Sequence, residues 1–478
     1  MGMKLVATAL LAALLCTTVS VEAAEAIEVI DTDGPVNIYA SITPTPPVDL
    51  RDVDVAALER RPVIRTHYVT LDARGIARAF NPTIATPYQV SIRFTDSAVF
   101  AIVVEAIEPV RDGVIRVSGH VRSDDLSRLS LVITDQHLLG TLNTATETLE
   151  FMRIQDGVSV VVEVEHRRYP EERRPGAAHK QPEFESFPHP EALEIIPTGG
   201  AIELPEPFDG VPYADTDYEA SEITVLAVAS DDEFACDAEW LEDMEDAYTA
   251  NLDEVFDSYA TSNVVFRCVD VPEDWHDLEE AREHIMNDGD MIDLRQAADA
   301  DIVVMLLADG LGYCGYSMAP EYPGYPINAT WTPFYAAHGA FAVVADECAL
   351  GNFSFAHEIG HLLGMKHERF SEKGGVSNFC GYGYPVMLGC KPVARTIMAY
   401  DGFCTFINGV TCKRAPWFSI PKQSSGSSFS AFSGGGLVKG MSCVSTDSDH
   451  LGAPANNTNQ LVDTADDVAG YSEHIDAL

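Results

Sequence analysis

The chain has 478 residues, of which 46% are hydrophobic, and its formal net charge is −44. That length is enough for two or three domains with ordinary cores. The strong negative charge excludes nucleic acid as a partner, because a phosphate backbone would be repelled. The Asp and Glu residues are concentrated in residues 201–310, and we interpret them as part of a solvated surface. A calcium (Ca2+) site is an alternative without support, because no EF-hand loop pattern occurs.

The N-terminus has the features of a secretory signal. A basic start is followed by the apolar run Leu5–Cys16 and then by small residues, with Val21 and Ala23 at the −3 and −1 positions of a cleavage site. The apolar run is too short to span a bilayer, and no later segment is more apolar. We therefore predict a signal peptide at 1–23 and a secreted, extracellular protein without a membrane span, with the periplasm as the alternative location.

Residues 24–168 are predicted to form a β-rich domain. Short apolar or alternating runs are separated by turn residues, which is the pattern of a β-sandwich or β-roll. The predicted strands are Tyr88–Phe94, Val99–Val104, Val114–Val121, Leu129–Ile133 and Val158–Val164.

Residues 169–221 are rich in proline, glycine and charge, and we predict a linker that is exposed to proteases. A basic cluster at its start is a candidate processing region, and a merely solvated linker is the alternative. The cluster consists of Arg167, Arg168, Arg173 and Arg174.

From residue 222 to 478 the pattern changes to alternating strands and helices. The run IVVMLL at 302–307 is apolar throughout, as in a strand buried on both faces of a parallel sheet. We predict an α/β (α+β) domain with a mixed, mostly parallel sheet. The expected strands are Ile223–Val228, Val264–Val269, Ile302–Leu307 and Ala340–Ala345, with helices at Glu239–Tyr259, Asp277–Asn287, from Asn352 and at Gln460–Tyr471.

The segment HEIGHLLGMKHE at 357–368 carries a metal-binding pattern. His357 and His361 lie four apart, so a helix presents both imidazoles on one face to a single zinc ion. Glu358 is adjacent and can take a proton from a metal-bound water. Gly364 can end the helix by adopting a positive φ, which brings His367 back as a third ligand. Three protein ligands with an open fourth position are typical of catalytic rather than structural zinc.

The whole pattern H-E-x-x-H-x-x-G-x-x-H resembles that of the metzincin metallopeptidases. Met398, within TIMAY at 396–400, resembles the Met-turn of that clan, although core packing is the commoner role of methionine. Within the clan, about residues 222–475 are most similar to bacterial reprolysin-like (M12) and peptidyl-Asp metallopeptidases, and 117–166 resemble their propeptides more loosely. The long serine- and glycine-rich stretch 421–455 departs from the family.

This resemblance implies a metzincin-type catalytic domain with one catalytic Zn2+, made as a zymogen and acting on proteins or peptides as a monomer. Glu358 would be the general base. Tyr400 would be an oxyanion donor, because a tyrosine two after the Met-turn methionine contacts the metal in some metzincins; a buried aromatic supporting the site is the alternative. We expect substrate to bind in extended form along an edge strand at Ala340–Ala345.

The peptidyl-Asp resemblance further suggests cleavage next to acidic residues. A basic residue would then be needed in the pocket of this acidic protein, and Lys366, Arg369 and Lys373 are nearest in sequence.

Nine of the ten cysteines follow residue 235, which favours disulfides in an exported chain. Nine is odd, so at least one would be free or paired between chains. Proximity and the family resemblance together suggest the pairs Cys404–Cys412 and Cys314–Cys348.

Two other functions compete with a peptidase. A non-catalytic binding or adhesion protein on a protease scaffold normally lacks the base or a ligand, and all four residues are intact here. A zinc hydrolase of small molecules would not need an edge strand or a propeptide-like domain.

Overall fold

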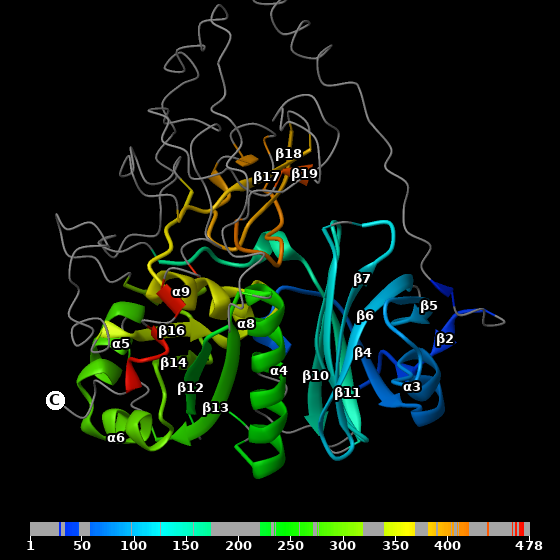
Figure 1. The fold of residues 1–478 in the computed structure, drawn as a ribbon, viewed down its shortest axis with the longest axis horizontal. Helices are drawn as coiled ribbons and strands as arrows, with labels where there is room; N and C mark the ends of the chain where they lie inside the picture. The colour runs from blue at the N-terminus through cyan, green and yellow to red at the C-terminus, as the bar shows by residue number, and fades with distance from the viewer. Residues whose placement is uncertain are drawn as a thin grey trace, which may run out of the picture.

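Two β-sheets lie side by side with the long helix α4 (Ala238–Phe256) between them (Figure 1). In the part of the chain that is described, no helix is long and apolar enough to cross a membrane. The predicted signal peptide lies outside that part. The computed structural model describes, with short internal gaps, residues 28–29, 34–46, 58–173, 220–318, 339–368, 381–388, 391–419, 437–438 and 461–472.

The N-terminal residues form one sheet of eleven strands, in which β5 to β11 and then β4 and β3 pair antiparallel and only β1 and β2 pair parallel with β5. A short helix, α3 (Ala73–Ala79), and a 3-10 turn, η1 (His166–Arg168), accompany it. The strands are β1 (Glu28–Val29), β2 (Val36–Asn37), β3 (Tyr39–Thr43), β4 (Val63–Leu71), β5 (Tyr88–Arg93), β6 (Val99–Arg111), β7 (Val114–Val121), β8 (Arg128–Ile133), β9 (Leu138–Asn143), β10 (Thr148–Gln155) and β11 (Val158–Val164).

This sheet curls upon itself. Strands β5 and β10 are five positions apart, or about 24 Å in a flat sheet. Nevertheless the rings of Phe94, just after β5, and Phe151, in β10, have centroids only 5.4 Å apart. The core is therefore enclosed by one rolled sheet. Of the two architectures expected from the sequence, this arrangement agrees with the roll, because the described strands form one sheet and not two.

The second sheet has the order β13-β12-β14-β16-β15. The first three pairs are parallel and β15 is antiparallel to β16. A small third sheet, β18-β17-β19, lies nearby. The elements are β12 (Glu222–Ser230), β13 (Thr261–Val269), α5 (Leu278–Asn287), α6 (Gly289–Ala297), β14 (Ile302–Leu307), β15 (Gly315–Ser317), β16 (Phe341–Ala345), α8 (Asp346–Ala349), α9 (Ser354–Leu362), β17 (Pro385–Leu388), β18 (Lys391–Arg395) and β19 (Leu437–Val438).

Helices cover both faces of the second sheet. Val304 and its alternate neighbours pack in a core with residues of α4 and α9, whereas Val303 and Met305 pack with residues of α5. Burial on both faces is the physical reason why β14 is apolar at every position.

The prediction of which strand forms the edge of the sheet is wrong. Strand β16 contains the run that we expected at the edge, but it lies between β14 and β15. The edge is β15, a three-residue strand of sequence GYS. Such a short strand has no apolar run by which sequence periodicity could detect it.

The acidic helix α4 faces basic side chains of the first sheet. Some of the acidic side chains that we interpreted as solvated surface therefore form ion pairs between α4 and the first sheet. The ion pairs are Arg111–Asp246 (3.1 Å), Arg116–Asp253 (2.8 Å), Arg128–Glu254 (2.9 Å) and Arg153–Glu239 (3.3 Å).

Residues Tyr169–Arg173, which we call the docked segment, leave the first sheet and lie against the second. The Cys314 N–H donates to the Glu171 carbonyl (3.1 Å), and the Arg173 N–H donates to the Gly315 carbonyl (2.8 Å). The buried Arg173 side chain also pairs with Asp277 at 2.7 Å. Although composition alone predicts a linker from residue 169, these first residues are packed. The rest of that linker, from residue 174 to 219, lies outside the described part.

Both disulfides suggested from the sequence are confirmed, and a third is added. Cys314–Cys348 joins the residue before β15 to α8, and Cys404–Cys412 closes a short loop. The third, Cys236–Cys268, joins the start of α4 to β13. Among the described residues no cysteine is free. The cysteine that the odd number leaves over would be one of Cys380, Cys390 and Cys443, which lie outside the described residues.

Candidate active site

Helix α9 places two histidines one turn apart. His357 and His361 have ring centroids 4.7 Å apart. Gly364 has a φ of +80°, the conformation that we expected to end the helix. The chain then returns, and the His367 ring lies 4.5 Å from that of His361 and 5.3 Å from that of His357. The turn at Gly364 thus gathers all three predicted histidines.

The three imidazoles each direct a ring nitrogen toward one point. Their candidate ligand atoms lie within 4.8 Å of one another, and the Nε2 atoms of His361 and His367 are 2.9 Å apart. The outward Nδ1 atoms face carbonyls, that of His357 toward Ile397 (2.8 Å) and that of His361 toward Met365 (2.9 Å). Such carbonyl contacts orient metal-binding histidines in general.

The cluster fits a zinc ion. All three histidines are buried, and the His357 Nε2 atom is buried without a hydrogen-bond partner. Burial lowers the pKa of His357 well below its usual value, which keeps the ring neutral, as a metal ligand must be. Three imidazoles are a donor set that suits catalytic zinc, which takes water as its fourth ligand.

Glu358 lies buried beside the cluster. The Ser317 hydroxyl at the end of the edge strand β15 donates to Glu358 Oε2 at 2.5 Å. Burial raises the pKa of Glu358 well above its usual value, and the nearby Glu172 carboxylate adds to the increase. A raised pKa suits a group that must both accept and release a proton.

Gly315 is needed so that Glu358 can lie where it does. A Cβ atom at Gly315 would come within 2.7 Å of Glu358 Oε1. Sequence reasoning missed both Gly315 and Ser317 as site residues. The only feature of the sequence that could have pointed to them is the cysteine-glycine pair at 314–315.

Replacing Gly315 by alanine is therefore expected to displace Glu358. We expect kcat/KM for peptide hydrolysis to fall by about 10- to 100-fold, because small misplacements of a reacting group have effects of that size. Bound zinc, measured by atomic absorption, should be unchanged. Gly289→Ala, where an added Cβ meets nothing within 4 Å, is the matched control. Full activity of Gly315→Ala would contradict the steric role.

Met398 packs against α9, the helix that carries His357 and His361. It is fully buried, and its sulfur would lie 2.5 Å from a Cβ atom at Gly360, so a glycine is required there. Tyr400 stacks on His367 with centroids 3.8 Å apart, and its N–H donates to Glu368 Oε2 at 2.6 Å. Both predicted residues are thus brought to the cluster.

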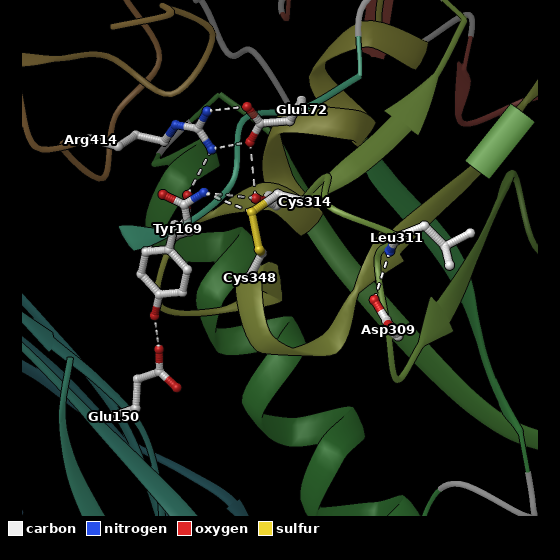
Figure 2. Close-up of a disulfide and its surroundings, with 10 residues drawn as sticks. Glu150, Tyr169, Glu172, Asp309, Leu311, Cys314, Cys348 and Arg414 are labelled. Carbon is white, nitrogen blue, oxygen red and sulfur yellow. Dashed lines mark hydrogen bonds and ion pairs between the residues drawn. A yellow bond between two sulfur atoms is a disulfide. The ribbon is translucent and has the colours of Figure 1, made fainter. Parts of the chain in front are cut away.

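Of the three basic residues expected near the pocket, only Lys366 lies in the described part of the chain. Lys366 is partly exposed, and its backbone bonds to Gly381 and Gly383. Arg369 and Lys373 lie outside the described residues. Sequence reasoning missed Arg414, which is fully buried against Glu172 of the docked segment (Figure 2).

Comparisons with known proteins agree with this geometry. Residues 264–368, from β13 to the third histidine, match the family model of the reprolysin-like metallopeptidases, family M12B. The resemblance to reprolysin-like metallopeptidases is confirmed. The match covers the metal-binding motif and the strands that lead to it, so this part of the chain has a metallopeptidase-like fold.

Two similar curated relatives are peptidyl-Asp metalloendopeptidases. The one from Stenotrophomonas maltophilia (strain R551-3) is 35% identical over 130 residues, which are 27% of this chain and 26% of the relative. The one from Xanthomonas campestris pv. campestris is 27% identical over 290 residues, 58% of this chain and 60% of the relative. The matches thus span about a quarter and three fifths of those relatives. Metalloproteinase-II from Bacteroides fragilis, a solved structure, shares 11% identity at a TM-score of 0.35 over 66% of this chain and 89% of that one.

Proposed function

We propose that this protein is a secreted zinc endopeptidase that is made as a zymogen. The observation that carries the proposal is the convergence of three buried imidazole nitrogens beside Glu358, a buried carboxylate on the helix that carries the first two histidines. A zinc ion held by His357, His361 and His367 would supply a water of lowered pKa and polarise the peptide carbonyl.

The protein's own residues would carry the proton transfers. Glu358 accepts the proton of the attacking water and later passes it to the leaving amine. Ser317 holds the Glu358 carboxylate by its hydrogen bond and so fixes the direction of transfer. The Tyr400 hydroxyl, whose ring stacks on His367, donates to the oxyanion that develops on the substrate.

Substrate would bind along β15. The free side of an edge strand can pair with an extended peptide through backbone hydrogen bonds. Because the edge strand carries Gly315 next to Glu358, a peptide bound there would have its backbone close to the base. The relatives' name speaks of aspartyl peptides, so bonds beside acidic residues are the first candidates for this protein.

The docked segment supports the zymogen proposal. It uses the Gly315 carbonyl, which an extended substrate would need, through the Arg173 N–H. Residues 24–168 would then be a propeptide, 169–221 the region where it is cut, and 222–478 the peptidase. The unbroken set of ligands and base disfavours the alternative of a non-catalytic binding protein.

The test is hydrolysis of denatured casein by the full chain recovered from the medium. We expect activity that a zinc chelator abolishes and added Zn2+ restores, and we expect the active species to begin between residues 174 and 222 by N-terminal sequencing. An active species that begins near residue 24 would contradict the zymogen. Absence of hydrolysis by every recovered form would contradict the peptidase.

A further inference from the structure

A buried carboxylate and a buried guanidinium meet beside the histidine cluster. The side chains of Glu172 and Arg414 are 1% and 0% exposed. Arg414 Nη2 donates to Glu172 Oε2 at 2.7 Å, and Nη1 donates to Oε1, so the contact is bidentate. Figure 2 shows the two groups facing each other close to the Cys314–Cys348 disulfide.

Arg414 and the residues around it form a site that suits a carboxylate, which we call the carboxylate site. The Ser354 hydroxyl adds a third donor to Glu172 Oε1 at 3.0 Å. Arg414 Nη1 is held by the Asn352 carbonyl at 2.8 Å, and the Asn352 side chain in turn donates to Ser354 Oγ at 3.1 Å. Ser354, Asn352 and Arg414 are all buried. Bidentate arginine with a supporting hydroxyl is a geometry that recognises carboxylates.

The carboxylate site lies next to the reaction centre. Ser354 is the first residue of α9, one turn before His357. Glu172 interacts electrostatically with both His357 and Glu358. A side chain bound by Arg414 would therefore lie close to His357 and Glu358.

Glu172 reaches this site as a substrate side chain would. The backbone groups on either side of it, the Glu171 carbonyl and the Arg173 N–H, bond to residues 314 and 315 at the edge of the sheet. A segment at the edge thus sends one side chain to Arg414 and Ser354, at the start of α9.

A purely structural role explains this pair poorly. Buried ion pairs stabilise a fold little more than well-packed apolar residues do, whereas a buried charge that loses its partner is costly. If the docked segment leaves with the propeptide, Arg414 stays in the peptidase and needs another carboxylate.

We propose that Arg414, with Ser354, forms a pocket for the acidic side chain of a substrate, and that Glu172 occupies this pocket as a pseudosubstrate. This inference rests on the proposed peptidase function. It assigns the preference for acidic residues to Arg414, and it assigns latency to occupation of the edge and the pocket by the docked segment.

The first experiment measures cleavage by zinc-loaded full-length chains. Glu172→Ala should raise the hydrolysis of peptides in a defined mixture at least tenfold over the unaltered chain, and mass spectrometry should find Asp or Glu enriched at one fixed position from the cuts. Adding Arg414→Gln should abolish the enrichment. On a matched Asp and Asn peptide pair, it should lower kcat/KM for Asp about 100-fold and for Asn less than threefold. Arg414→Lys, which keeps the charge but not the fork, should lie between them.

The control is Glu165→Ala, because Glu165 lies just before the docked segment and its side chain pairs with the exposed Arg168 at 2.7 Å. It should leave the activity of the full chain low. An equal rise in activity with Glu165→Ala and Glu172→Ala, or an equal loss of kcat/KM on both peptides with Arg414→Gln, would overturn the inference while leaving the peptidase proposal standing.

The second experiment does not depend on catalysis. A labelled peptide with the sequence of residues 167–176 should bind the Glu172→Ala chain, measured by fluorescence anisotropy. Binding should weaken at least tenfold when the peptide carries Glu172→Gln or the chain carries Arg414→Gln. Binding that ignores both changes would overturn the pocket. If no chain cleaves any peptide but this binding pattern holds, the peptidase proposal fails and the carboxylate pocket stands.

Discussion

The Glu358→Gln variant should bind zinc like the unaltered protein but hydrolyse peptides at least about 10³-fold more slowly. Glutamine has nearly the shape of glutamate but cannot accept a proton, and general-base catalysis contributes on the order of 10²- to 10⁴-fold. Because Glu358 is buried beside the histidines and does not belong to their cluster, its loss should not empty the metal site. The measurements are kcat on a fluorogenic peptide and zinc content by atomic absorption.

Glu280→Gln, at an exposed position of α5, is the control and should keep full activity. Substantial hydrolysis by Glu358→Gln would remove Glu358 from the mechanism. Loss of zinc in that variant would instead indicate that Glu358 helps to hold the metal.

The second large effect is expected for His367→Ala. Two histidines on a helix remain, but the third ligand nitrogen, 2.9 Å from the Nε2 atom of His361, is lost. Changes to residues that merely support metal ligands weaken affinity by about 10- to 100-fold, and loss of a ligand should weaken it further. We expect zinc affinity to fall at least about 10²-fold and proteolysis to disappear at limiting zinc.

Competition with a chromogenic chelator measures that affinity. His284→Ala is the matched control, because His284 lies half exposed on α5 beside Asp288. A change in thermal unfolding measured without metal would report any separate loss of packing against Tyr400. Unchanged zinc affinity of His367→Ala would show that the third ligand is another residue.

Local spacing was sufficient to predict that the three histidines gather. The four-residue interval between His357 and His361 and the glycine at 364 act within a few residues of one another, so helix geometry and a positive φ place the side chains. The same holds for the longer strands, whose apolar runs are readable as periodicity. Met398 and Tyr400 were located through their family context, and the packed core brings both to the histidines.

Features that depend on pairing between distant segments were not readable. The edge strand β15 is too short to carry a periodic signal, and its position follows from pairing with β16. The docked segment has the composition of a linker because its apolar content is low. It is held instead by backbone hydrogen bonds and ion pairs, which leave no hydrophobic pattern.

The sequence by itself therefore determined the three histidines, the adjacent glutamate and the class of chemistry that they support, because each depends on local geometry. Tertiary structure alone decided which strand forms the edge, what lies along it and which arginine faces the site. Glu172 and Arg414 are 242 residues apart, and only the folded chain brings the two charges together. No local spacing encodes such a contact, since it arises from the packing of two sheets and the path of the segment between them.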